Sequence, residues 1–395
     1  MAATVSRNAM SQYVADTTSD LFIRDVPDWT QVYRRHDTPF LNAIGRATAP
    51  SRPMLKAEWG WSYLDPVQDQ LAEALDDSET GVDVDNGTYF QVGNVLKVDS
   101  EHMRVTSIST NTLTVVRGYG GTTAAAHNDD SKVEILGVSM TENADDPLSP
   151  ITQGEVDFNY HQLMQFGWQF SQRAEATPTY ESEGVGSNRF QIELKKKMEK
   201  TAPVFLERTL LFGQRALGST TAASAMGGLA QSSYVTTRTS LSSAPLTEYD
   251  LLNAINTVWT LVGDDIGKTV MTSMFGKRIV NSWYNNTRRT GGGDSRINLT
   301  FDEIETDMGT FKITTNYQFD ATDGEKDNLY LLNFDDFKLR PYASNTGWQT
   351  GVRATDGPYK FGFLRGDFTM LCSKPDTRLQ LHTWSTTASD YPGFA

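Results

Sequence analysis

The stretch Ser187–Ala216 reads SNRFQIELKKKMEKTAPVFLERTLLFGQRA and predicts the longest helix of the chain. Its apolar side chains recur at steps of three and four residues, which places them on one helical face: Phe190, Leu194, Met198, Ala202, Phe205, Leu206 and Leu210. Ser187 suits an N-cap, and Gly213 or Gly218 suits a helix stop. At ~1.5 Å per residue this helix is about 45 Å long. We therefore expect it to be a spine against which other elements pack.

Pro203 lies inside this predicted helix. Proline has no backbone N–H, and its ring crowds the carbonyl of the residue four positions earlier, which is Glu199. The sequence therefore predicts a kink of the spine at Pro203, within residues 199–203.

The composition excludes several classes of protein. A chain of 395 residues with 21% charged and 11% aromatic residues is globular, and this length predicts two or three domains. The formal net charge of -14 argues against a nucleic-acid reader, which needs a basic surface. The single cysteine, Cys372, excludes an internal disulfide and fits a reducing compartment. No signal peptide and no membrane-spanning segment are expected.

The N-terminal part reads as a polar extended arm over residues 1–20, followed by two short helices. Asp28 can cap the first, around Trp29–Arg35, and Thr38 with Pro39 can begin the second, Phe40–Gly45. Their apolar side chains need a partner surface: Trp29, Val32, Tyr33, Phe40, Leu41 and Ile44. That surface is either a neighbouring subunit or the chain's own domain.

Two segments far apart in the sequence alternate apolar and polar residues, as strands do. They are residues 55–63 and 156–170, and the second is about three times as long as a typical strand of ~5 to 6 residues. We expect a long two-stranded ribbon with an aromatic face that another surface covers. The alternative is a pair of strands in an ordinary buried sheet. The aromatic face consists of Trp59, Trp61, Tyr63, Phe158, Phe166, Trp168 and Phe170.

Between these strands, residues 85–140 contain short apolar runs separated by turn residues. Such spacing predicts a small β-barrel or sandwich, with acidic linkers at residues 71–85 and 142–150. After the spine, Thr247 and Asp250 form a capping box for a helix, and further strands follow a glycine loop at 286–296. Helices and strands are segregated, which predicts the α+β class.

Catalytic, cofactor-binding and metal-binding residues are not predicted. The five histidines are scattered without metal-ligand spacing, and phosphate-binding and nucleophile motifs are missing from the sequence. Carboxylate clusters at residues 76–85 and 302–305 could serve glycoside hydrolysis, and the eight tryptophans could stack on sugars. Acidic linker residues are more often solvated. The alternative function is therefore an acidic carbohydrate-active or sugar-binding β-rich protein, such as a tail component.

The order of these pieces resembles the major capsid protein of tailed bacteriophages, whose shell fold is shared with the herpesvirus capsid floor. The segments that carry this resemblance are Thr38-Pro39-Phe40-Leu41 with Ile44-Gly45-Arg46, Trp59 with Asp65, and Met226-Gly227-Gly228-Leu229. The insert is similar to the β module of one capsid subgroup in Val92-Gly93-Asn94-Val95, Leu113-Thr114-Val115 and Arg117-Gly118-Tyr119-Gly120-Gly121-Thr122.

The resemblance implies a division of the chain into four parts. They are an N-terminal arm (1–50), an extended loop (51–170) with the inserted β domain (85–140), a peripheral domain (171–219 and 336–395) containing the spine helix (187–216), and an axial domain (220–335).

The resemblance also implies the function and the partners. Subunits would form hexamers and pentamers of an icosahedral shell enclosing double-stranded DNA, without sequence-specific contact. A portal and a separate scaffolding protein are expected, a decoration protein is allowed, and no lysine and asparagine pair supports a covalent cross-link. Assembly is expected in the host cytoplasm, and the protein is expected in the virion capsid. A basic run on the spine comprises Lys195–Lys197 and Lys200. These lysines either contact DNA or the scaffolding protein, or form a solvated face of the helix.

Residues expected at contacts between subunits are Trp29, Phe40, Trp59, Trp61, Tyr63, Phe158, Phe166, Trp168 and Phe170. On this basis Trp168→Asp should give soluble protein that forms no shell. The kink at Pro203 is either fixed or a switch between two shell states.

Overall fold

The computed structural model describes residues 37–62, 64–142, 148–150, 154–176, 189–283, 303–322, 324–344, 347–354 and 359–391. The chain forms two compact units. Unit 2 is Gly60–Val156, and unit 1 comprises the residues on either side of it. Unit 1 contains both helices and strands, and most of its strand pairs are antiparallel, which agrees with the predicted α+β class.

A five-stranded sheet of unit 1 is built around β18 (Tyr359–Cys372). Three strands pair with β18 in antiparallel fashion, and a fourth extends the sheet beside β16: β10 (Gln162–Ser171), β16 (Phe337–Pro341), β17 (Gln349–Ala354) and β1 (Gly45–Arg46). Two glycines make room for aromatic rings of β18. A Cβ at Gly167 would lie 2.8 Å from the ring of Phe361, and one at Gly351 would lie 2.5 Å from that of Phe363.

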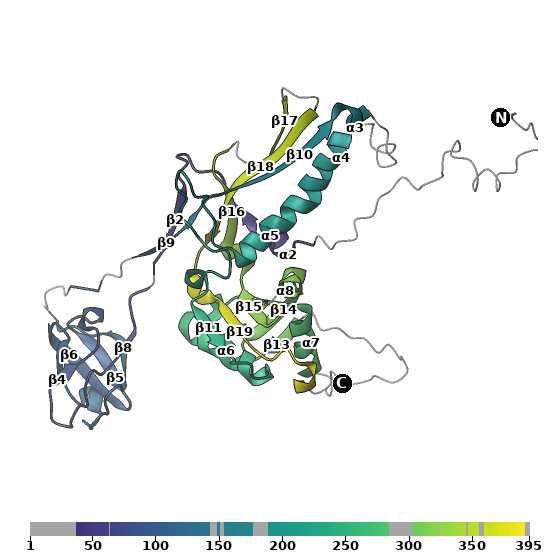
Figure 1. Cartoon of the computed structure of the whole chain (residues 1–395). Coiled ribbons are helices and arrows are strands. Elements are labelled where there is room, and N and C mark those ends of the chain that lie inside the picture. The colour runs from purple at the N-terminus through teal and green to yellow at the C-terminus, as the bar shows by residue number, and fades with distance from the viewer. Residues whose placement is uncertain are drawn as a thin grey trace, which may run out of the picture. The chain divides into compact units, whose positions relative to one another are not determined.

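The spine runs along β10 and β18 (Figure 1) and consists of α4 (Arg189–Lys196), a π-helical turn η4 (Lys197–Thr201) and α5 (Ala202–Phe212). The π turn ends two residues before Pro203, and the Ala202 N–H donates to the carbonyl of Lys197. A widened turn of this kind absorbs a local irregularity without ending the helix. The helix ends at Phe212 and not at Ala216, because Gly213 has an extended backbone.

The predicted apolar face of α5 is confirmed at Ala202, Leu206 and Leu210, but the buried face also includes Glu207 and Leu211 and does not include Phe205. Its buried residues are Ala202, Leu206, Glu207, Leu210 and Leu211. Phe205, which the periodicity placed on the apolar face, is 53% exposed. The offset follows from the π turn, since the extra residue in that turn rotates α5 relative to α4.

A six-stranded mixed sheet forms the other half of unit 1. Its strands in spatial order are β11 (Thr237–Ser240), β19 (Leu379–His382), β15 (Asn328–Leu332), β12 (Thr269–Thr272), β14 (Gly309–Thr315) and β13 (Glu303–Thr306). One face packs under α6 (Glu248–Val262) and α7 (Met274–Trp283). The other face, with Met271 and Tyr330, joins the core around α5 and α8 (Tyr317–Ala321).

The capping box predicted for α6 is confirmed. The Thr247 side chain accepts the N–H of Asp250, and the Asp250 carboxylate accepts the N–H of Thr247 at 3.0 Å. These two bonds satisfy backbone donors that would otherwise be unpaired at the start of the helix.

Unit 2 contains one six-stranded antiparallel sheet with its own core. The strands in spatial order are β3 (Gln68–Gln70), β8 (Lys132–Val138), β5 (Asn94–Val98), β6 (Glu101–Ser109), β7 (Thr112–Val116) and β4 (Gly81–Asp83). Alternate residues of β5, β6 and β7 are buried, as a strand with one covered face requires.

The predicted continuous ribbon is wrong beyond residue 160. β2 (Lys56–Trp61) pairs with β9 (Glu155–Tyr160), but β10 belongs to the five-stranded sheet, as the alternative interpretation held. Asn159 explains the break, because its buried amide donates to the carbonyls of Gly227 and Met370 at 3.0 Å. These two bonds fix the chain to the core of unit 1 just before His161, where the two strands separate.

Candidate assembly surfaces

A buried carboxylate holds the short helix α2 (Pro39–Ala43) against the spine. Glu207 of α5 is fully buried and accepts the N–H of Phe40 at 3.0 Å and that of Leu41 at 2.6 Å. It also accepts the side-chain amide of Asn316 at 2.7 Å. Burial raises the pKa of Glu207, while the donors from Leu41, Asn316 and Phe40 oppose that rise. We call Glu207, Phe40, Leu41 and Asn316 the arm anchor.

Phe40 was predicted to contact another subunit, and this prediction is wrong. Its ring is fully buried and packs edge-on against Phe337 at 5.3 Å and Phe334 at 6.0 Å between ring centroids. The physical reason is the arm anchor, which draws the N-terminus of α2 into the core of its own chain.

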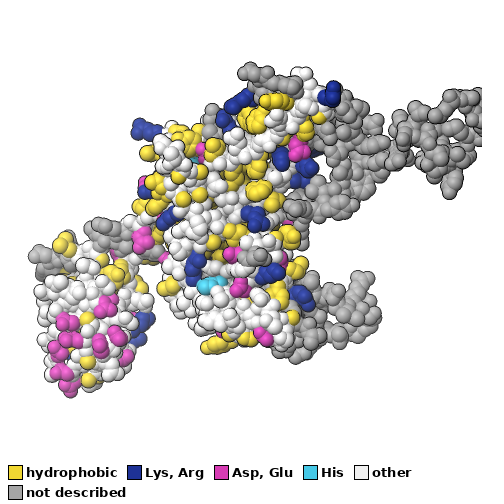
Figure 2. All heavy atoms as spheres, viewed as in Figure 1, with side chains coloured by type: hydrophobic (Ala, Val, Ile, Leu, Met, Phe, Trp, Pro, Cys, Tyr) yellow, Lys and Arg dark blue, Asp and Glu magenta, His cyan; other side chains and the backbone are white. Residues whose placement is uncertain are grey.

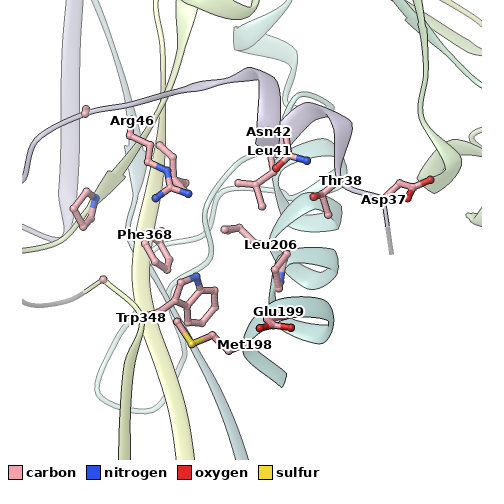
Figure 3. A pocket seen from close by; sticks show the side chains of 15 residues that line it. Asp37, Thr38, Leu41, Asn42, Arg46, Met198, Glu199, Leu206, Trp348 and Phe368 are labelled. Carbon is pink, nitrogen blue, oxygen red and sulfur yellow. The ribbon is translucent and has the colours of Figure 1, made fainter. Parts of the chain in front are cut away.

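A groove of about 640 Å³ lies between α2, the spine and the five-stranded sheet (Figure 3). Its walls carry apolar side chains from all three elements, and Arg46, Glu199 and Asp37 add charge. The principal lining residues are Leu41, Arg46, Met198, Leu206, Trp348 and Phe368. We call this the spine groove. Met198 of the π turn is 46% exposed, so an apolar side chain faces solvent there.

Phe166 lies in an aromatic row that joins the spine to the sheet. Its ring is 5.7 Å from Phe205 and 6.2 Å from Trp348, which is 5.1 Å from Phe368. Phe166 is partly buried, whereas Phe205 is half exposed. Sequence reasoning did not identify Phe205 and Trp348 as surface residues. Their positions depend on the rotation of α5 and on the fold of residues 347–354, and no pattern of neighbouring residues in the sequence indicates either.

The aromatic residues of β2 and β9 are partly buried. Trp59 packs on the core of unit 1, with its ring 5.8 Å from Tyr234. The cationic groups of Lys56 and Arg215 each lie 4.2 Å from the centroid of the Phe158 ring. Trp61 and Phe170 are also partly buried. Trp29 and Tyr63 lie outside the described residues.

Trp168 is buried inside unit 1, so its predicted role at a subunit contact is wrong. Only 8% of it is exposed, and it packs with Ala202 and Leu364 beneath the spine. We expect Trp168→Asp to lose several kcal/mol, because Trp truncation alone costs about 3 to 5 kcal/mol and a charge is added. The variant should therefore be insoluble or unfolded, in contrast to the soluble protein expected from the sequence.

The soluble yield and the urea midpoint of this variant measure the effect. Gln169→Asp is the matched control, since the neighbouring Gln169 of β10 is exposed and should tolerate the same aspartate. A soluble Trp168→Asp protein with an unchanged midpoint would contradict the assignment of Trp168 to the core.

Large apolar side chains are exposed at the two chain ends of unit 2 and on the residues of unit 1 that adjoin them in sequence. Each of six such residues is more than half exposed: Met54, Leu64, Val67, Leu148, Val156 and Leu163. Sequence reasoning missed them, although their signal was present. Leu64, Val67 and Leu148 are apolar residues in polar or acidic surroundings near the predicted linkers, whereas Met54 adjoins Leu55, and Val156 and Leu163 belong to the predicted strand 156–170.

An ion pair is buried in unit 2. Arg117 donates to both oxygens of Glu101 at 2.7 and 2.8 Å and to the carbonyls of Asp76, Glu79 and Ala125. Glu101 is fully buried; its desolvation is outweighed by hydrogen bonds from Arg117 and from the Ala125 and Gly118 amides, which lower its pKa to about 2. These bonds join β6 to two loops, so their role is structural.

Nearly all the net charge of the chain resides in unit 2. Its 97 residues contain 17 Asp and Glu and 4 Lys and Arg, which gives a formal charge of -13. The remaining 298 residues contain 32 Asp and Glu and 31 Lys and Arg, which gives a formal charge of -1. Figure 2 shows acidic side chains gathered on the visible face of unit 2. One predicted carboxylate cluster forms a turn, since Asp76 accepts the N–H groups of Ser78 and Glu79 at 2.7 Å.

Among the described residues, no group of three or more His, Cys, Asp or Glu side chains is placed to hold a metal ion. In the same part of the chain, none of the helices combines the length and the apolar character needed to cross a membrane.

Solved structures from a phage and from a GTA capsid have the same fold. A chain of Gordonia phage Cozz superposes with a TM-score of 0.50 at 10% sequence identity, covering 98% of this chain and 99% of the other. A capsid chain of a native GTA particle gives a TM-score of 0.51 at 8% identity, covering 95% and 100%. Curated proteins give no match.

The model of the SU10 major capsid protein family matches residues 8–381. That range includes the arm anchor, the spine, the whole of unit 2 and both sheets of unit 1 except His382 at the end of β19. The match confirms the resemblance to phage capsid proteins. The chain therefore belongs to the SU10 major capsid protein family and is a shell-forming component of a virus capsid.

Proposed function

We propose that the chain assembles into hexamers and pentamers, which close into an icosahedral shell around double-stranded DNA. Subunits are joined by non-covalent contacts, and the chain has no enzymatic role. A portal and a separate scaffolding protein take part in assembly, which occurs in the host cytoplasm. A decoration protein is an allowed addition.

The single observation that carries the proposal is the set of exposed apolar residues at the two chain ends of unit 2 and next to them in sequence. Leu64 is 93% exposed, Leu148 is 94% exposed, and four further residues exceed 50%. A soluble monomer gains nothing from these side chains, whereas burial against a second copy contributes roughly 25 cal/mol per Å². The partly buried Trp59, Trp61, Phe158, Phe166 and Phe170 are proposed to extend these contacts, together with Tyr63.

For assembly we propose the same division of the chain into four parts. They are the N-terminal arm (1–50), the extended loop (51–170), the peripheral domain (171–219 and 336–395) and the axial domain (220–335). In this division the loop of one subunit lies over its neighbour. Stability is then a property of the lattice and depends on protein concentration.

Electron microscopy of the purified chain tests the proposal, with closed shells or capsomers as the expected particles. The double variant Leu64→Asp with Leu148→Asp should abolish shells while the urea midpoint stays unchanged, since both side chains are exposed in the monomer. Val116→Asp is the control, because Val116 is 49% exposed on β7, which pairs with β6 and β4 and not with β3 or β8. Normal shells from the double variant would refute the contact assignment.

A further inference from the structure

A single residue, His161, separates β9 from β10. Its N–H donates to the carbonyl of Leu55 at 2.9 Å, and its carbonyl accepts the hydroxyl of Ser224 at 2.6 Å. Leu55 directly precedes β2, the strand that pairs with β9, whereas β10 belongs to the five-stranded sheet. We call β2 and β9 the ribbon. His161 therefore lies where the ribbon is joined to the sheet.

The imidazole of His161 is buried beside ionisable groups without a hydrogen bond to them. Only 1% of the residue is exposed, and its Nδ1 lies 3.8 Å from Oδ1 of Asp367 on β18. Among the described residues, neither of these two atoms has a hydrogen-bond partner, and the same holds for Nε of Arg340 on β16. The ring packs edge-on against Tyr342, with 5.2 Å between the centroids.

We call His161, Asp367, Arg340 and Tyr342 the junction cluster. The ionisable groups that face the imidazole are thus a carboxyl from β18, a guanidinium from β16 and the phenol that follows β16. The contacts from the segments around Leu55 and Ser224 are made by uncharged groups.

This site suits a neutral imidazole and opposes a charged one. Burial and the positive charge of Arg340 lower the pKa of His161 from 6.5 to about 4. Asp367 lies beyond hydrogen-bond distance, and burial raises the pKa of its carboxyl, so acid removes its negative charge more readily than usual. Because the folded pKa of His161 lies below the unfolded value, its contribution to stability is present above about 6.5 and is lost as pH falls toward 4.

We propose that His161 is an acid-sensitive contact that holds the ribbon to the five-stranded sheet. At neutral pH the uncharged ring packs within the junction cluster. In acid the ring binds a proton and must be solvated, so the junction opens and the ribbon is released while both sheets of unit 1 stay folded. Asn159 also holds β9, through bonds to Gly227 and Met370 that do not titrate, so acid shifts an opening equilibrium that favours the closed state at neutral pH.

Hydrogen exchange of the full chain at about pH 7.5 and about pH 5 tests the proposal, with each rate divided by the intrinsic rate of an unfolded peptide at the same pH. The open state of residues 155–163 should be at least about tenfold more populated at the lower pH, because the solvated ring binds a proton that the buried ring does not. Amides of β12, a central strand of the other sheet, should change by less than about twofold.

His161→Gln keeps a neutral polar side chain and removes the titration, so the acid effect on residues 155–163 should disappear. His382→Gln is the matched control, since His382 lies at the end of β19, outside the junction cluster, and the acid effect should persist in this variant. An acid effect that survives in His161→Gln, that is missing from the wild-type chain or that is equally large in β12 would overturn the proposal.

A second measurement does not depend on the folding of His161→Gln. In a chain with isotope-labelled histidine rings, the magnetic resonance signal of His161 is assigned by replacing each of the other four histidines with glutamine. This signal should titrate with a midpoint of about 4, and a midpoint at or above the ordinary value of 6.5 would contradict the proposal. The acid-sensitive contact is a property of the single chain and goes beyond shell formation, so the two proposals can fail separately.

Discussion

Glu207→Ala should lower the free energy of unfolding by at least about 3 kcal/mol. The variant leaves two buried backbone N–H groups of α2 and the Asn316 amide without their acceptor, and each unpaired buried donor costs about 1 to 3 kcal/mol. Because these bonds hold α2 to α5, loss of α2 docking should accompany the loss of stability. Urea unfolding and hydrogen exchange of residues 39–46 measure the two effects.

Glu199→Ala is the matched control, because Glu199 is an exposed glutamate of the same spine and should change stability by less than about 0.5 kcal/mol. Equal effects of the two variants would show that the arm anchor contributes nothing specific. Glu207→Gln tests the charge. Burial raises the pKa of Glu207, so its protonation favours the folded state below its unfolded pKa, and this contribution is lost as pH rises through the raised value. Glu207→Gln should remove that pH dependence.

Arg117→Ala should unfold unit 2 while unit 1 stays folded. Removing one partner of a buried ion pair costs about 3 to 5 kcal/mol, because Glu101 would remain buried and charged. Unit 2 has its own core and few residues to absorb such a loss. Hydrogen exchange by mass spectrometry should show fast exchange within residues 60–156 and native protection elsewhere.

Arg104→Ala is the control, since Arg104 makes one hydrogen bond to the Ser139 carbonyl and should cost about 1 kcal/mol. Protection of unit 2 at the wild-type level in Arg117→Ala would refute the role of the ion pair. The pH dependence has a defined sign. Because the pKa of Glu101 is lowered to about 2, its contribution to stability is present above its unfolded pKa and declines as pH falls toward 2.

The sequence predicted those elements whose signal is local. The alternation of apolar and polar residues around Trp59 predicted β2, and the pair of Thr247 and Asp250 predicted the start of α6. Both signals depend only on residues close together in the sequence, namely the hydrophobic period of a strand and the capping bonds of a helix. The spine was also apparent from its period, but the π turn before Pro203 changed which residues of α5 face inward.

The surfaces could not be predicted in the same way, because they depend on partners remote in sequence. Glu207 appeared as one charged residue in a helix, and its three donors lie more than 100 positions away. The break after Asn159 likewise depends on Gly227 and Met370. Trp168 and Phe40 carried an aromatic pattern that fits a core as well as an interface, and only the tertiary packing distinguishes the two.

The uneven division of charge has a consequence for the behaviour of this protein in solution. Unit 1 is close to electrically neutral, so copies of it can approach at low ionic strength without a long-range barrier, whereas unit 2 acts as a small polyanion that gathers its own cloud of counterions. Salt should therefore change colloidal properties, such as electrophoretic mobility and retention on an anion exchanger, much more than it changes the strength of contacts made by unit 1.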